Sequence, residues 1–115
     1  MATTQLHREH LVKKYVKDGL VAVIYNDSYG TGWYSWHEIE ELLFDPKLVE
    51  FVLDQDYNQI SEYLGSYWPE TVRYNSYTYQ SLKVCWLPEH TQFMVLEYDG
   101  QETVVTKESI KWIQA

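Results

Sequence analysis

The stretch of sequence that is most informative about the fold is Val21-Ala22-Val23-Ile24-Tyr25-Asn26-Asp27-Ser28-Tyr29-Gly30-Thr31-Gly32-Trp33-Tyr34-Ser35-Trp36. Its apolar beginning predicts a strand over 20–26. Gly30 and Gly32 then lie between aromatic residues, where two glycines permit positive φ angles and a close approach of the backbone to a partner. The aromatic run that follows predicts a second strand over 32–36. A Rossmann dinucleotide site is disfavoured, because the third glycine and an immediate helix are missing.

The segments around this stretch predict four helical elements: a helix over 6–17, a short helical turn within 37–44, and two central helices from Pro46 to about residue 54 and from about residue 57 onward. Asp45 and Asp56 are the expected N-caps of the two central helices. Gly65 and Pro69 are expected to end the second one.

The last third of the chain predicts strands over four ranges: 82–87, 91–98, 102–106 and 110–113. Asp99-Gly100 is a strong signal for a two-residue hairpin turn. The whole chain, residues 1–115, therefore predicts one α+β domain. In this domain a single antiparallel sheet carries the two central helices on one face.

The composition restricts the class of partner. The formal net charge is -8, from 17 acidic and 9 basic residues. Because nucleic-acid binding depends on neutralising phosphates, an acidic chain without a dense basic stripe is a poor candidate for it. Four basic residues do gather near the start, which indicates either a basic edge or an ordinary solvated segment: Arg8, Lys13, Lys14 and Lys17.

The expected compartment is intracellular. No apolar run approaches the roughly 18 residues of a membrane helix, and the first residues lack the apolar core of a signal peptide. The single cysteine, Cys85, cannot form an internal disulfide, which fits a reducing environment.

The sequence indicates no catalytic set, cofactor or metal. The four histidines, His7, His10, His37 and His90, do not have the spacing of a structural zinc site. Cys85 lies within a strand pattern, where cysteines are usually inert packing residues. No serine stands between glycines as in a nucleophile elbow, and the cluster Glu38, Glu40 and Glu41 is typical of a solvated face.

Binding is easier to support, and two interpretations of the glycine loop stay open. Backbone amides from Tyr29 to Gly32, flanked by Tyr29 and Trp33, could surround a phosphate and stack a base. Alternatively, the glycines only permit a tight hairpin whose tryptophans anchor the core. The residues alone favour this second interpretation.

A different hypothesis uses the charge of -8 and the neighbouring Tyr74, Tyr77 and Tyr79. In this hypothesis the chain is an acidic protein-protein inhibitor of a host defence or nucleic-acid-binding protein.

Five blocks of the chain together resemble a family of small phage and viral proteins: Val21-Ala22-Val23-Ile24, Gly30-Thr31-Gly32-Trp33-Tyr34-Ser35-Trp36, Leu42-Leu43-Phe44-Asp45-Pro46, Trp86-Leu87-Pro88-Glu89 and Glu97-Tyr98-Asp99-Gly100-Gln101-Glu102. They span most of the chain and are similar to the first family of Thoeris anti-defence proteins. Members of that family are sponges, which sequester cyclic nucleotide immune signals without cleaving them.

The resemblance implies a non-enzymatic protein in the cytoplasm of the infected host cell. It implies a homodimer or a higher even-numbered homo-oligomer, with no nucleic-acid or membrane partner. It also implies that a cyclic ADP-ribose isomer, or a related cyclic oligonucleotide, is held between the glycine loop of one subunit and the C-terminal sheet of another. A small enzyme acting on nucleotides remains a third hypothesis.

The resemblance carries the loop positions over as ligand-binding residues: Tyr29, Gly30, Thr31, Gly32 and Trp33. Thr31 departs from the family pattern, which favours alanine there, and this leaves the identity of the ligand open. From the sheet, chemistry alone suggests three further residues: Tyr79 to stack, Gln92 to recognise polar edges and Lys107 to neutralise a pyrophosphate.

Overall fold

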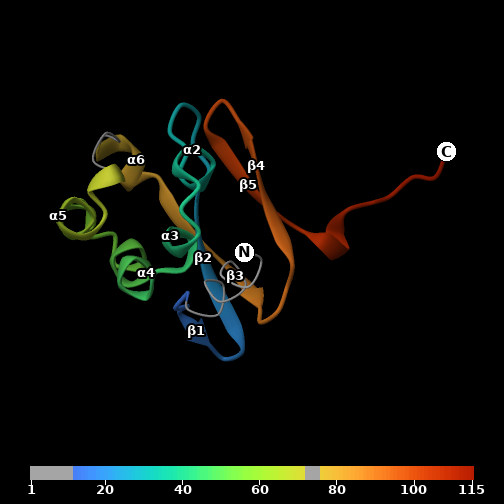
Figure 1. The fold of residues 1–115 in the computed structure, drawn as a ribbon, viewed down its shortest axis with the longest axis horizontal. Helices are drawn as coiled ribbons and strands as arrows, with labels where there is room; N and C mark the ends of the chain where they lie inside the picture. Colours follow the sequence, from blue (N-terminus) through green and yellow to red (C-terminus); the bar gives the residue numbers. More distant parts are fainter. Residues whose placement is uncertain (1–11, 72–75) are drawn as a thin grey trace, which may run out of the picture.

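A computed structural model describes residues 12–71 and 76–115 and shows an α+β fold with two antiparallel sheets (Figure 1). The strands are β1 (Val16–Lys17), β2 (Leu20–Asn26), β3 (Leu82–Pro88), β4 (Phe93–Tyr98) and β5 (Gln101–Thr106). The helices are α2 (Tyr34–His37), α3 (Glu41–Phe44), α4 (Pro46–Leu53), α5 (Tyr57–Tyr67) and α6 (Ser76–Gln80), with 3-10 turns η1 (Pro69–Thr71) and η2 (Lys107–Ser109). Within this part of the chain, no helix has the length and apolar character that spanning a bilayer requires.

Strand β2 lies at the centre of the molecule, and both of its faces are buried. Ala22 and Ile24 pack against the core formed with helices α4 and α5, whereas Val21 and Val23 pack against a second core formed with α3, β3 and the β4–β5 hairpin. Figure 1 shows these helices on one side of β2 and β3 and the hairpin on the other. The apolar run shows no alternation because neither face meets solvent.

The two central helices begin where the sequence predicts. The Asp45 carboxylate accepts hydrogen bonds from the amides of Lys47 and Leu48, at 2.9 and 3.1 Å, and Asp56 accepts one from Gln59 at 3.2 Å. Both N-caps are therefore confirmed. The second helix ends at Tyr67, ahead of Pro69, so the prediction that Gly65 helps to end it was wrong.

The single predicted sheet is in fact two sheets. Strands β1, β2 and β3 form one, and β4 pairs only with β5 in the other. The N-terminal helix prediction also fails from residue 12 to 17, because Val16 and Lys17 pair with β2; residues 1–11 lie outside the described part of the chain. The predicted strand over 110–113 has no strand partner among the described residues and forms an extended tail.

The predicted strand over 32–36 is replaced by helix α2. Gly32 has φ of +77°, and the amides of Trp36 and His37 then donate to the Trp33 carbonyl. The Trp33 side chain is fully buried, and its indole N–H donates to the Leu42 carbonyl at 3.0 Å. Burying this large side chain requires the chain to turn, so tertiary packing overrides the strand propensity of the aromatic run.

Candidate functional site

The glycine loop packs directly on the tip of the β4–β5 hairpin. The Gly30 amide donates to the Asp99 carbonyl at 2.5 Å. Gly100, at φ +87°, lies so close to the loop that a Cβ atom on it would stand 2.6 Å from the Thr31 nitrogen. Only glycine fits at such a contact. Two motifs that are far apart in the sequence are therefore adjacent in space.

A single buried carboxylate fixes the base of this loop. Glu102, on β5, is 1% exposed. One of its oxygens accepts from the Asn26 amide at 2.9 Å, and the other accepts from the Trp33 amide, the Ser35 amide and the Ser35 hydroxyl at 2.7 to 3.0 Å. Hydrogen bonds to a charged acceptor are among the stronger ones in proteins. The amide of Trp33 is therefore already bound to an anion that the protein itself supplies.

The interior of the loop is closed by Thr31. Its hydroxyl lies 2.6 Å from the Asn26 side-chain oxygen and 2.5 Å from the Ser28 carbonyl. The Asn26 side-chain N–H2 donates to the Thr78 carbonyl at 3.0 Å, so the same network reaches helix α6. Threonine at position 31, where the resemblance favours alanine, thus adds a hydrogen bond inside the loop.

Of the five predicted loop residues, only Tyr29 and Gly30 are exposed, whereas Thr31, Gly32 and Trp33 are buried. Tyr29 is 65% exposed and meets the 70% exposed Tyr98 edge to face, with ring centroids 6.3 Å apart. The loop tip therefore presents an aromatic pair. Trp33 lies in the core as folded and offers no surface for stacking.

A groove of about 720 Å³ opens between the start of β4 and the segment that follows the glycine loop. One wall comes from α2, α3 and the connection between them, and the other from the residues before and within β4. Its lining residues are Lys14, Tyr34, Glu40, Leu43, Phe44, Thr91, Gln92, Phe93, Met94 and Val95. The groove combines a cation, a carboxylate, a phenol and an amide with apolar side chains.

Glu102 also fixes one wall of this groove. Tyr34 lies between Trp33 and Ser35, and both of these residues donate their amides to the Glu102 carboxylate. Burial is the largest cause of a raised pKa at Tyr34, and the negative charges of Glu40 and Glu38 raise this pKa further. A tyrosine phenol is protonated at neutral pH in any case, so Tyr34 presents a hydrogen-bond donor.

Of the three residues predicted from the sheet, Gln92 and Lys107 are adjacent, whereas Tyr79 lies elsewhere. Gln92 lines the groove, and its carbonyl accepts from the Lys107 amide at 2.9 Å. This pair lies at the opposite end of the hairpin from the glycine loop, roughly 20 Å away for a six-residue strand. Tyr79 belongs to helix α6, not to a sheet, and its hydroxyl donates to the Thr71 carbonyl at 3.4 Å.

Tyr79 is 5% exposed, so it cannot contribute to an exposed tyrosine cluster as folded. Tyr74 and the side chain of Tyr77 lie outside the described part of the chain. The groove instead contains two residues that sequence reasoning did not select, Lys14 and Tyr34. The only signals for them were the basic residues near the start of the chain and the position of Tyr34 directly after the Gly32-Trp33 step.

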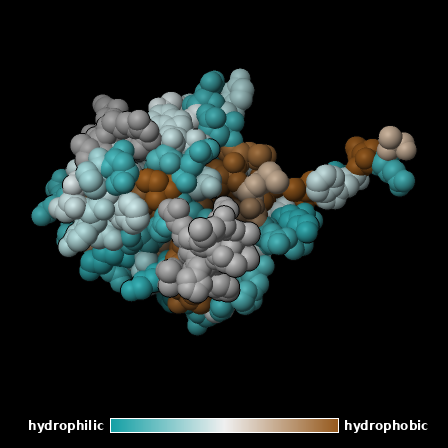
Figure 2. Space-filling view, viewed as in Figure 1, coloured by the Kyte–Doolittle hydropathy of each residue, from teal (hydrophilic) through white to brown (hydrophobic). Residues whose placement is uncertain are grey.

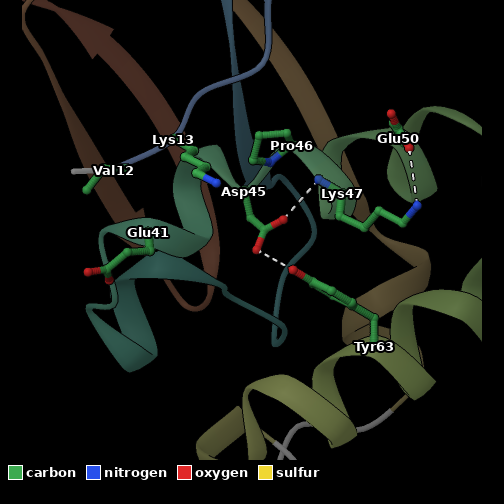
Figure 3. Close-up of a pocket in the computed structure, with 8 residues that line it drawn as sticks. All are labelled: Val12, Lys13, Glu41, Asp45, Pro46, Lys47, Glu50 and Tyr63. Atoms are coloured by element: carbon green, nitrogen blue, oxygen red, sulfur yellow. Dashed lines mark hydrogen bonds and ion pairs between the residues drawn. The ribbon is translucent and has the colours of Figure 1, made fainter. Parts of the chain in front are cut away.

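A second cavity, of about 490 Å³, lies beside the N-terminus of helix α4 (Figure 3). There the Asp45 carboxylate caps the helix with one oxygen and accepts from the Tyr63 hydroxyl at 2.6 Å with the other. Burial, together with this hydrogen bond, raises the pKa of Tyr63 to about 12. Figure 3 shows Asp45 between Lys47 and Tyr63, so its carboxylate is already engaged in holding α4 against α5.

Cys85 and His37 are not among the residues that line the groove. Burial raises the pKa of the Cys85 thiol, which keeps it protonated at neutral pH. His37 accepts a hydrogen bond from the Ile39 amide at 2.9 Å through Nδ1. Across residues 12–71 and 76–115, no three side chains of the metal-binding types gather into a cluster.

Comparison of the chain with protein-family models, with curated proteins and with solved structures finds no match. What the protein binds is therefore inferred from its own residues and their arrangement.

Proposed function

We propose that the protein is a non-catalytic binding protein that takes up a cyclic nucleotide and holds it intact. The setting we propose is that of a phage-encoded sponge in the cytoplasm of an infected cell, where it removes a cyclic ADP-ribose isomer or a related cyclic oligonucleotide. The resemblance to the first family of Thoeris anti-defence proteins supports this. The contact between Gly30 and Asp99, which joins two of the resembling blocks, adds further support.

The observation that carries the proposal is the groove beside β4. Its volume of about 720 Å³ falls within the range of pockets that hold small molecules and cofactors. Lys14 supplies a cation for a phosphate, Gln92 an amide for the polar edge of a base, and Tyr34 a ring and a hydroxyl. These are the groups that a nucleotide needs, and Gln92 is one of the residues predicted from the sequence.

The net charge of -8 does not prevent the uptake of an anion. Charge-assisted hydrogen bonds act at contact and contribute roughly 1.5 to 3 kcal/mol each. Glu40 lines the groove and opposes an anion there, whereas repulsion from surface carboxylates more than about 10 Å away is screened by salt. We expect Lys14 and the Gln92 amide, which line the groove, to offset the repulsion of a phosphate group.

The protonation states of Tyr34 and Cys85 are compatible with binding that leaves the ligand intact. Tyrosine is protonated at physiological pH, and burial raises the pKa of Tyr34 further, so its hydroxyl is a neutral hydrogen-bond donor. The Cys85 thiol is also kept protonated, and Cys85 is not a lining residue of the groove. The proposed role is thus sequestration.

Native mass spectrometry tests this proposal. The purified protein is incubated with a panel of cyclic ADP-ribose isomers and cyclic dinucleotides, its mass is recorded, and it is then denatured to identify what is released. We expect the added mass of one panel member, followed by release of that molecule intact. A protein that gains no ligand, or that releases a hydrolysed product, contradicts the proposal.

Two variants test where the ligand binds, and a third serves as the control. Gln92→Ala removes an amide from the groove, and Tyr29→Ala removes the exposed ring at the loop tip. Gln59→Ala, on the exposed face of α5, is the control for loss of an amide. We expect Gln92→Ala to reduce uptake and Gln59→Ala to leave it unchanged. Loss of uptake in Tyr29→Ala alone would place the ligand at the loop tip.

A further inference from the structure

One wall of the groove follows helix α3 from its first turn to its end. Glu40, Leu43 and Phe44 all line the groove. They stand three and four positions apart, and the Leu43 amide donates to the Glu40 carbonyl at 3.0 Å, so they share one helical face. Because a helix rises about 1.5 Å per residue, Glu40 and Phe44 are roughly 6 Å apart along this wall. The groove therefore has a Glu40 end and a Phe44 end.

The Phe44 end of the groove carries the cation. The Lys14 ammonium lies 4.8 Å from the centre of the Phe44 ring. A smaller cavity of about 80 Å³ adjoins the groove here, because the two share four lining residues: Lys14, Phe44, Thr91 and Phe93. His90 also lines the smaller cavity, whereas Glu40 does not. A lysine and a histidine side chain therefore make this end suitable for a phosphate group.

The Glu40 end carries an open hydrogen-bond acceptor. Within residues 12–71 and 76–115, no hydrogen bond or ion pair engages the Glu40 carboxylate. Burial is the largest cause of the raised pKa of Tyr34 and the charge of Glu40 is the next, so the carboxylate lies near the phenol. A carboxylate only accepts hydrogen bonds, whereas a tyrosine hydroxyl also donates. This end thus presents an acceptor beside a donor.

The opposite wall of the groove is largely apolar. Figure 2 shows hydrophobic surface over the β4–β5 hairpin, and strand β4 gives the groove Phe93, Met94 and Val95. Aromatic and apolar side chains pack against the face of a base and leave its polar edge free. The edge of a base held on β4 is therefore available to Glu40 and Tyr34 on the other wall.

We propose that Glu40 selects a nucleotide whose base carries an exocyclic amino group. This inference rests on the proposed uptake of a cyclic nucleotide in the groove. The amino group of the base donates to the Glu40 carboxylate, and the Tyr34 hydroxyl donates to the neighbouring acceptor of the base. Adenine, guanine and cytosine carry such an amino group, whereas hypoxanthine and uracil do not.

The same placement separates the phosphate from the carboxylate that repels it. The phosphate lies at the Phe44 end beside Lys14, and the base lies at the Glu40 end. A base with a carbonyl oxygen in place of the amino group would turn one acceptor toward another. The Glu40 carboxylate would then lose its water without gaining a hydrogen bond, which disfavours binding.

Calorimetric titration with pairs of ligands that differ at the amino group tests this selection. Cyclic di-AMP and cyclic di-GMP are each compared with cyclic di-IMP, in which hypoxanthine replaces both bases. A cyclic ADP-ribose isomer that binds is compared with its hypoxanthine counterpart. We expect the amino-bearing member of a pair to bind at least about tenfold more tightly.

Two variants assign the preference to one side chain. Glu40→Gln keeps the size of the side chain but adds a donor, so the preference should fall to about twofold or less. Glu38→Gln is the matched control, because it removes the same charge near Tyr34 from an exposed residue that does not line the groove. This control should keep the full preference. Circular dichroism confirms that both variants are folded.

The inference is overturned if wild type binds both members of a pair equally, or if Glu40→Gln keeps the full preference. In either case a nucleotide still binds, so the proposed function stands. If neither member of any pair binds, the proposed function fails and this inference fails with it. The two failures are therefore distinguishable.

Discussion

At the scale of single residues, Glu102 has the largest local effect. It is a buried carboxylate, and four donors from the end of β2, the glycine loop and α2 converge on it. A buried charge is tolerated only when hydrogen bonds replace its lost hydration, and here they do. The residue joins the β4–β5 hairpin to the loop and thereby holds Tyr34 at the wall of the groove.

Replacing Glu102 should therefore destabilise the fold. Glu102→Ala leaves the amides of Asn26, Trp33 and Ser35 without their acceptor, and we expect a loss of about 3 kcal/mol or more in the free energy of unfolding. Urea denaturation followed by tryptophan fluorescence measures it. Glu62→Ala, on the exposed surface of α5, should change stability by less than about 0.5 kcal/mol. Equal stability of the two variants would show that the Glu102 network contributes nothing.

Tyr63 makes the stability of the fold sensitive to alkaline pH. Its pKa rises from 10.0 to about 12, first through burial and then through its hydrogen bond to Asp45. A group whose pKa is raised on folding stabilises the protein fully below its unfolded pKa and loses that contribution as the pH rises through its folded pKa. The contribution of Tyr63 is therefore complete below about pH 10 and fades toward pH 12.

Tyr63→Phe tests this pH dependence. At neutral pH we expect the variant to be less stable by about 1 kcal/mol, because it lacks the hydrogen bond to Asp45. The difference between wild type and variant should shrink as the pH is raised from 10 to 12. Urea denaturation midpoints of both proteins across this pH range measure the difference in stability. A difference that stays constant would contradict the predicted pH dependence.

At the scale of elements, the junction between the glycine loop and the hairpin turn depends on the absence of one side chain. Gly100 and Gly30 both have positive φ, +87° and +75°. A Cβ atom on Gly100 would meet the Thr31 nitrogen at 2.6 Å, whereas one on Gly30 would meet nothing within 4 Å. The two positions thus share the backbone conformation and differ in packing.

This pair of glycines gives a controlled test of the junction. Gly30→Ala should cost about 1 kcal/mol, which is the cost of a left-handed conformation alone. Gly100→Ala adds a steric clash, and we expect about 2 kcal/mol or more in total. Thermal or urea unfolding of the two variants measures the difference. If both lose the same amount, the hairpin tip does not pack on the loop as described.

The sequence predicted those elements that depend on local interactions. The caps at Asp45 and Asp56 and the Asp99-Gly100 turn involve residues only a few positions apart, so pattern reasoning found them. Helix α2 was missed because its conformation depends on the Trp33 side chain entering the core and on Glu102, 69 positions further along the chain. No local pattern contains such a contact.

At the scale of the whole molecule, the fold has three layers, and the candidate groove lies where two of them meet. Helices α4 and α5 cover one face of the β1-β2-β3 sheet, and the hairpin covers the other together with Leu43 and Phe44 of α3. The hairpin is fixed to the loop at its tip, while its other end meets α2 and α3 across the groove. Lys14 reaches the same groove from the segment before β1 and lies 4.8 Å from the centre of the Phe44 ring.

The candidate site was only partly predictable for the same reason. Gln92 was selected for its chemistry and does line the groove, whereas Lys14 and Tyr34 join it only because three separate segments meet there. Trp33 and Tyr79 were selected as stacking residues, and both are buried. An aromatic side chain that packs in a core and one that stacks on a ligand look alike in a sequence.

The most direct measurement is a calorimetric titration of the protein with each cyclic nucleotide of the panel, repeated for Lys14→Ala and for the control Lys47→Ala. Lys14 lines the groove, whereas Lys47 lies on α4 in the other cavity. We expect one nucleotide to bind wild type and Lys47→Ala with similar affinity and to bind Lys14→Ala at least about tenfold more weakly, the effect of losing one charge-assisted contact. No heat of binding from any nucleotide, or equal affinity in all three proteins, would contradict nucleotide uptake in this groove.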